Sequence, residues 1–84
     1  MLILTRHAQL NVARDRLDPA WIEATITKPQ RADRDPKDAP LTRAWRNIPE
    51  RGGRALRGVF RPLGADILVI TVFFDRGARR WLPT

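Results

Sequence analysis

A single stretch of the chain, Asp66 to Phe74, limits the folds available to it, because the stretch is rich in β-branched and aromatic residues and apolar on both faces. Such a composition favours a β-strand. One face of that strand carries Ile67, Val69, Thr71 and Phe73, and the other carries Leu68, Ile70, Val72 and Phe74. A strand with two apolar faces is normally covered on both sides. The sequence therefore predicts a sheet that needs cover on both faces at this strand.

Two helices are expected before the sheet. Thr5 can cap a first helix that ends near Leu17, because its hydroxyl can accept a backbone N–H of the first turn. Asp18 followed by Pro19 is a second start signal, and this helix stops before Pro29. At 84 residues the chain is long enough for one small domain, residues 1–84.

Strands are expected in the second half of the chain. Residues 41–48 and 54–61 alternate as half-buried strands, and a Gly52-Gly53 turn separates them. Residues 29–40 form a charged, Pro-rich stretch with nothing to bury, which we expect to be a loop. Residues 1–4 can add a short edge strand. The order predicts an α+β class, with two N-terminal helices packed on a three- to four-stranded antiparallel sheet.

The second face of the sheet has no obvious cover in this plan. Another chain can supply it, as a homodimer through the 66–74 strand or as a cognate partner. Alternatively, the sheet curls, and the Pro-rich loop or Trp81 folds beneath it. The residues after the strand, 78–81, are expected to be a basic tail.

The basic excess is concentrated in the second half. Residues 1–40 carry seven Lys or Arg against six Asp or Glu, whereas residues 41–84 carry nine Arg against three acidic residues. Arginine pairs bidentately with phosphate and stacks on bases. The natural partner of such a surface is a polyanion, and an acidic protein is the other candidate.

The composition excludes several kinds of site. With no cysteine and one histidine, the chain cannot form a disulfide, a cysteine-based zinc site or a histidine-rich metal site. We expect no metal or other cofactor. The longest apolar run, Ile67 to Phe74, is far shorter than the ~20 residues that span a bilayer. The apolar residues 1–4 are too short for a signal peptide. We therefore expect a cytoplasmic domain without membrane contact.

Three segments carry a resemblance to known proteins. Leu4-Thr5-Arg6-His7-Ala8 opens the first helix, Leu56-Arg57 lies on a strand, and residues 71–76 close the sheet. These segments resemble a family of small bacterial domains of unknown function, similar in plan to the RelE/ParE-like and BrnT-like toxins of toxin–antitoxin pairs. The resemblance covers residues 2–79 and implies helices followed by an antiparallel sheet.

The same resemblance implies a function. It implies a toxin-type endoribonuclease that acts on RNA, free or on the ribosome, without a metal, and that an acidic antitoxin-like protein inhibits. Position by position, it points to His7, Arg57 and Arg76 as catalytic residues. Further arginines of the basic half are expected to bind nucleic acid: Arg54, Arg61, Arg79 and Arg80.

Metal-free RNA cleavage needs a base for the 2′-hydroxyl proton, cations for the charge on phosphorus and an acid for the leaving oxygen. Imidazole is the one side-chain group that ordinarily titrates near neutrality, so His7 is the candidate base or acid. Arg57 and Arg76, with Arg54 as a third candidate, would hold the phosphate. The second proton-transfer group would be Glu50, Asp75 or water.

Each residue also has a simpler interpretation. A lone histidine in a first helical turn often faces solvent, and Arg57 with Arg61 can form a solvated strand face. Asp75 with Arg76 can be a strand-ending turn with a local ion pair. Trp45 either stacks on a base or fills the small core, and the same holds for Trp81.

These simpler interpretations lead to other functions. One is a non-catalytic basic module that binds nucleic acid or an acidic partner protein, and salt-dependent binding without cleavage would favour it. Another is a scaffold that dimerises through the 66–74 strand.

Overall fold

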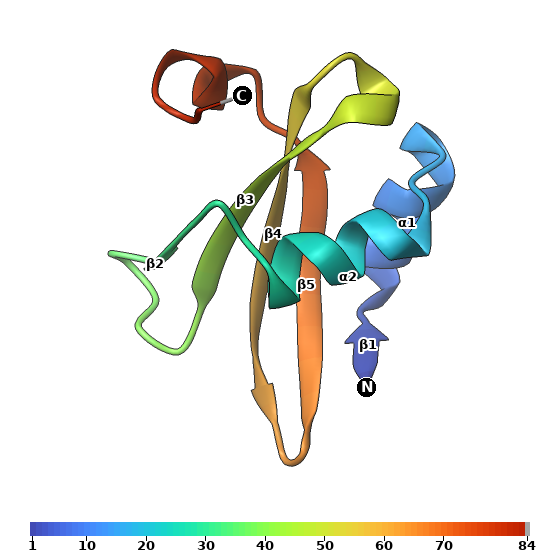
Figure 1. Cartoon of the computed structure of the whole chain (residues 1–84). Helices are drawn as coiled ribbons and strands as arrows, with labels where there is room; N and C mark the ends of the chain where they lie inside the picture. Colours follow the sequence, from blue (N-terminus) through green and yellow to red (C-terminus); the bar gives the residue numbers. More distant parts are fainter. Residues whose placement is uncertain (84) are drawn as a thin grey trace.

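Five strands form one mixed sheet, and two helices lie across one of its faces (Figure 1). The computed structural model describes residues 1–83. In chain order the elements are β1 (Leu2–Leu4), α1 (Arg6–Asp15), α2 (Pro19–Thr27), β2 (Arg31–Arg34), β3 (Thr42–Ile48), the 3₁₀ helix η1 (Pro49–Arg51), β4 (Arg54–Leu63), β5 (Asp66–Phe74) and the 3₁₀ helix η2 (Arg76–Arg80).

The sheet has the order β1-β5-β4-β3-β2. β1 runs parallel to β5, and the other neighbours are antiparallel. The α+β class with two helices is confirmed. The expectation of three to four antiparallel strands is wrong in detail, because β1 adds a parallel pairing and β2 adds a fifth strand.

Both helices begin where their capping residues predict. The Thr5 hydroxyl oxygen accepts a hydrogen bond of 3.1 Å from the N–H of Ala8. The Asp18 carboxylate accepts one of 2.9 Å from the N–H of Ala20, and Pro19 occupies the first helical position. Each cap satisfies a backbone donor that the first turn leaves without a helical partner.

The first helix ends at Asp15, two residues before the expected Leu17. Arg16 adopts the left-handed conformation, with φ 52°, and stops the helix. The Arg51 guanidinium, from η1, donates hydrogen bonds to the carbonyls of Asp15 and Arg16, at 2.7 and 3.0 Å. These bonds satisfy carbonyls that the helix end leaves open.

The first helix also closes the outer edge of β5. β1 pairs with β5 only as far as Val69. Beyond that point, the Thr5 hydroxyl donates to the carbonyl of Ile70 at 2.8 Å, and Asn11 Oδ1 accepts from the N–H of Val72 at 3.2 Å. Side chains thus complete an edge that would otherwise expose unpaired backbone groups. This pairing places α1 beside the end of β5.

A β-bulge in the central hairpin changes the faces predicted for β5. Val59 pairs with Thr71, but Phe60 pairs with Val69, so Ile70 has no opposite residue. The bulge shifts the alternation by one position, because one extra residue is inserted. The buried core on the helix side therefore takes residues from both predicted faces: Ile67, Val69, Val72 and Phe74.

The segment 29–40 is not entirely a loop, because it contains β2. Asp33 of β2 pairs with Arg43 of β3 through an ion pair of 2.7 Å. The carboxylate of Asp35 accepts the backbone N–H groups of Lys37 and Asp38 in the connecting turn. Polar contacts hold this exposed strand, so a hydrophobic pattern could not predict it.

The chain itself covers part of the second face. The residues expected as a basic tail fold into η2, which packs Ala78 against Trp45 at one end of the sheet. Trp81 meets Trp45 edge-on, with ring centroids 4.9 Å apart. Near the other end, Pro40 of the Pro-rich segment lines a hollow together with Ile70. The chain therefore covers the second face only in part, and the homodimer stays a prediction.

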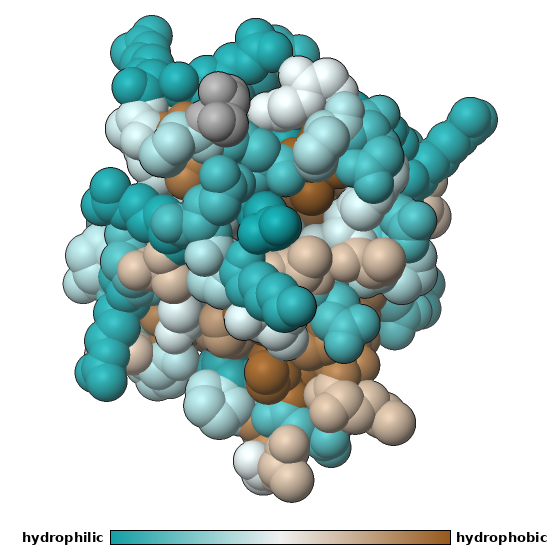
Figure 2. Space-filling model, viewed as in Figure 1, coloured by the Kyte–Doolittle hydropathy of each residue, from teal (hydrophilic) through white to brown (hydrophobic). Residues whose placement is uncertain are grey.

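The helix-bearing side of the molecule is mostly hydrophilic. Figure 2 shows polar side chains over most of it, with hydrophobic side chains emerging in the lower part of the view, around β1. Among residues 1–83, no helix combines the length and the apolar character needed to cross a membrane.

Candidate functional site

A cavity of about 450 Å³ lies along the completed edge of β5, between α1 and η2. His7, Asn11 and Arg14 line it from one face of α1, because positions four and then three residues apart share a helix face. Asp15, the last residue of α1, lines it as well. The remaining walls come from Arg54 of β4, the end of β5 and Arg76 of η2. The lone imidazole therefore shares a cavity with arginines from the basic half of the chain.

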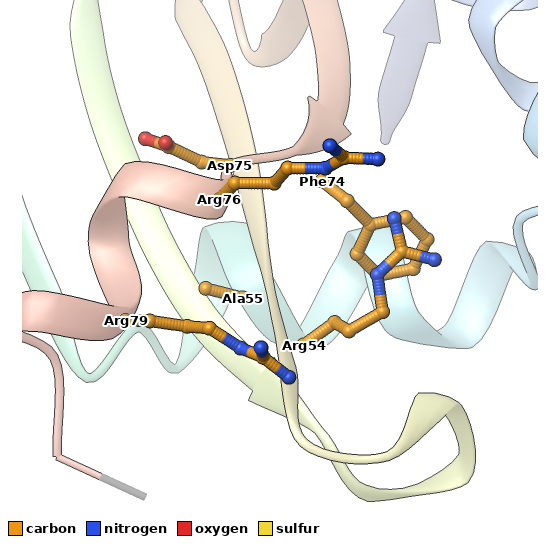
Figure 3. Close-up of a pocket in the computed structure, with 6 residues that line it drawn as sticks. All are labelled: Arg54, Ala55, Phe74, Asp75, Arg76 and Arg79. Atoms are coloured by element: carbon orange, nitrogen blue, oxygen red, sulfur yellow. The ribbon is translucent and has the colours of Figure 1, made fainter.

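A second cavity of about 450 Å³ continues from the first and shares Arg54, Phe74 and Arg76 with it. It adds Arg79 and Asp75 (Figure 3). Arg76 and Arg79 extend from η2 on the side of Arg54, whereas the Asp75 carboxylate is turned to the opposite side (Figure 3). We call the two cavities together the arginine cleft.

Three cationic groups of the arginine cleft have no anionic partner. Within residues 1–83, Arg54, Arg76 and Arg79 take part in none of the ion pairs. The Arg54 guanidinium lies 4.3 Å from the centroid of the Phe74 ring, a cation–π contact that fixes its position. Unpaired guanidiniums in a concave surface form a site for an anion, and phosphate suits their planar fork.

Asp15 is a cleft residue that the sequence reasoning missed. Arg14 donates two hydrogen bonds to its carboxylate, at 3.2 and 3.0 Å. These bonds, with the charges of Arg14, Arg54 and Arg51, hold the pKa of Asp15 below its usual value despite partial burial. Asp15 is therefore ionised at neutral pH and can accept a hydrogen bond but not supply a proton. Asp15 follows His7 by two helical turns, and this spacing could have predicted that both residues line the same site.

Asn11 was missed as well. Its Oδ1 accepts hydrogen bonds from the Thr71 hydroxyl and the N–H of Val72, at 2.8 and 3.2 Å. Its amide NH₂ donates to no group within residues 1–83. Because Asn11 lines the cleft, this amide is a further donor available to an anion.

The structure does not bring Arg57 into the cleft. Arg57 lies on the face of the sheet away from the helices, with its guanidinium 5.6 Å from the Trp45 ring and 5.2 Å from the Phe73 ring. Its Nη1 is 3.9 Å from the Asp75 carboxylate. The expected trio of His7, Arg57 and Arg76 is therefore not assembled, and Arg54 lines the cavity with His7 and Arg76 instead.

The remaining candidates lie outside the arginine cleft or serve the fold. Arg61 is near the other end of the sheet, where it donates to the carbonyl of Pro62. Arg80 is exposed on η2 and Glu50 is exposed on η1, and neither lines the cleft. Asp75, the other suggested proton-transfer group, accepts hydrogen bonds from the Trp45 indole and from the N–H of Gly77. Within residues 1–83, no group of three or more carboxylates or imidazoles is placed to hold a metal ion.

The fold and the cleft together define a small α+β domain with a basic, concave surface at one edge of a mixed sheet. Residues 4–74 match the domain of unknown function DUF4258, and the chain belongs to that family. No curated protein and no solved structure matches the chain. The expected membership of a small uncharacterised domain family is thus confirmed, and the likeness to toxins stays a prediction.

Proposed function

We propose that the protein is a metal-independent endoribonuclease that binds the RNA backbone in the arginine cleft. The observation that supports this is the placement of His7, Arg54 and Arg76 around one cavity, although they come from α1, β4 and η2. An imidazole, which can accept and donate a proton, thus lines the same cavity as cations that make no ion pair within residues 1–83. Charge stabilisation and proton transfer are the two requirements of RNA cleavage without a metal.

In this mechanism the phosphate lies between Arg54 and Arg76, and the Asn11 amide donates a further hydrogen bond to it. His7 takes the proton of the adjacent 2′-hydroxyl, and the 2′-oxygen attacks phosphorus. The bond from phosphorus to the 5′-oxygen breaks, and water protonates the leaving oxygen. The hydroxide that remains takes the proton from the His7 imidazolium, which restores the base. The products are a 2′,3′-cyclic phosphate and a 5′-hydroxyl end. The two guanidiniums stabilise the charge that builds on phosphorus.

The proposal extends to the partners expected from the toxin likeness. The substrate is RNA, free or on the ribosome. An acidic antitoxin-like protein would inhibit the enzyme by placing carboxylates on the unpaired arginines of the cleft, Arg54, Arg76 and Arg79. The same positive field would speed the association of either partner.

The test is an RNA cleavage assay with single-residue variants. His7→Ala should abolish cleavage. Arg54→Ala and Arg76→Ala, each made singly, should reduce the cleavage rate by about 10²-fold, because each removes a charge that stabilises the transition state. Arg61→Ala is the matched control, because Arg61 is an arginine outside the cleft and should leave cleavage unchanged. Cleavage by His7→Ala at the wild-type rate would remove His7 from the mechanism.

A second candidate is a non-catalytic module that binds nucleic acid in the same cleft. It is favoured by the ionised state of Asp15, which leaves the cavity around His7 without a carboxylic acid to protonate a leaving group. Such a module would bind RNA without cutting it, and each of Arg54, Arg76 and Arg79 would contribute about one unit to the slope of log affinity against log salt. Intact RNA after long incubation, with this slope, would select the module over the enzyme.

A further inference from the structure

The second face of the sheet holds a separate hollow that contains two indole rings. Its volume is about 310 Å³, and its walls include Trp45, Trp81, Arg31 and Arg57. Trp45 is buried, with 3% of its surface exposed, whereas Trp81 has 43% exposed. A large aromatic ring that is nearly half exposed beside a hollow is available for stacking. We call this site the tryptophan hollow.

Cationic groups already stack on these rings. The guanidinium of Arg31 lies 4.9 Å from the centroid of Trp81, and that of Arg43 lies 5.3 Å from the centroid of Trp45. Arg31 is exposed and makes no ion pair within residues 1–83, so its side chain can move without losing one. A planar group can therefore enter between the Arg31 guanidinium and the exposed face of Trp81. Trp and Arg planes together are a usual platform for a base.

The polar groups of the hollow suit a base better than a phosphate. Two carboxylates, those of Asp33 and Asp75, line it together with three guanidiniums, those of Arg31, Arg43 and Arg57. The walls thus offer carboxylate acceptors for a base amino group and guanidinium donors for a base ring nitrogen or carbonyl. A nucleobase carries both kinds of group, and a phosphate carries acceptors only.

The tryptophan hollow adjoins the arginine cleft. Asp75 lines both. One strand of nucleic acid can therefore place a phosphate on the cleft arginines and a neighbouring base on Trp81. We propose that the tryptophan hollow is a stacking subsite for one base of single-stranded RNA, held by Trp81 and Arg31. This inference rests on the proposed nucleic-acid binding of the cleft and adds the recognition of a base to it.

The experiment compares two oligomers of about eight nucleotides, the size range of small single-strand sites. One is a run of deoxyadenosines, which lacks the 2′-hydroxyl and is not cleaved. The other is an abasic oligomer of equal length and charge. The full chain should bind the deoxyadenosine oligomer at least about fivefold more tightly, since stacking is lost in the abasic one. This comparison uses the wild-type protein and needs no variant to fold.

Variants then assign the preference to the hollow. Trp81→Ala should remove the preference by weakening binding of the deoxyadenosine oligomer, while binding of the abasic oligomer stays the same. Trp81→Phe should keep most of it, because an aromatic face remains. Leu63→Ala is the matched control, since it truncates a side chain that is similarly exposed, at 40%, in the hairpin between β4 and β5.

The outcomes separate the two proposals. If the wild type binds both oligomers equally, or if Trp81→Ala weakens both by the same factor, the stacking subsite is overturned and the phosphate cleft stands. If the wild type binds neither oligomer at low salt, both proposals fail. Tight binding of an acidic protein that Trp81→Ala weakens, without any effect on the oligomers, would assign the hollow to a protein partner and overturn the inference.

Discussion

The indole N–H of Trp45 donates a hydrogen bond of 3.0 Å to the carboxylate of Asp75, and this bond joins the buried face of β3 to the end of β5. The other oxygen of Asp75 accepts the N–H of Gly77 at 3.0 Å, which starts η2. Asp75 therefore fixes the direction of η2, and with it the positions of Arg76 and Arg79 in the cleft.

We predict that Asp75→Ala destabilises the protein by about 1–3 kcal/mol. The Trp45 indole is buried, so removal of its acceptor leaves a donor without a partner. The loss should appear as a lower denaturant midpoint in equilibrium unfolding. Asp75→Asn keeps an acceptor oxygen and should cost less. Equal stability of wild type and Asp75→Ala would show that this hydrogen bond makes no net contribution to the free energy of unfolding.

The sequence predicts elements well where one local pattern decides them. The last strand was predicted with its observed bounds, and both helix starts follow from Thr5 and Asp18. β2 was missed because its contacts are polar and come from another strand, as in the pair of Asp33 with Arg43. The bulge at Ile70 was missed because it depends on the register between two strands.

The candidate site was predictable only in part. The charge distribution indicated the basic half, and the strand period of two already places Arg54 and Arg57 on opposite faces of β4. That signal would have excluded Arg57 from a site shared with Arg54. The approach of His7 to Arg76 depends on the pairing of β1 with β5, which brings the start of the chain to the end of the sheet. No local pattern encodes that pairing.

Asn11 should be more important for stability than its polar character suggests. It is 5% exposed, and its Oδ1 accepts two hydrogen bonds from β5. We predict that Asn11→Ala costs about 1–3 kcal/mol, because the N–H of Val72 loses its partner in a buried position. Thr71→Val removes only the hydroxyl donor and should cost about 0.5–1.5 kcal/mol. Thermal unfolding of both variants checks the order, and a larger loss for Thr71→Val would contradict it.

Gly58 lies beneath α2 and tolerates only a small side chain. A Cβ at this position would lie 3.5 Å from Cγ1 of Ile26 and 4.0 Å from Cγ2 of Thr25, which is ordinary van der Waals contact. We predict that Gly58→Ala leaves stability unchanged or raises it by up to about 1 kcal/mol, because alanine restricts the unfolded chain. Gly58→Leu would overfill the same space and should cost about 1–3 kcal/mol or more. Chemical denaturation measures both. A clear loss of stability for Gly58→Ala would contradict this prediction and show that the space beneath α2 is tighter than these distances indicate.

Asp15 gives the cleft a dependence on pH whose sign is fixed by its lowered pKa. The carboxyl has a lower pKa in the folded chain than in the unfolded chain, so its contribution to stability is complete above about pH 4 and is lost as the pH falls through the folded value. We predict that Asp15→Asn removes at most about 1 kcal/mol of stability at pH 7, because the pair with Arg14 is at the surface. At a pH below the folded pKa the two proteins should be equally stable, since both then lack the charge. Unfolding in urea at the two pH values measures this difference. At pH 7 the same variant should bind the abasic oligomer more tightly than wild type, because one negative charge leaves the cleft. A variant that stays equally less stable at both pH values would show that the contribution of Asp15 does not depend on its charge.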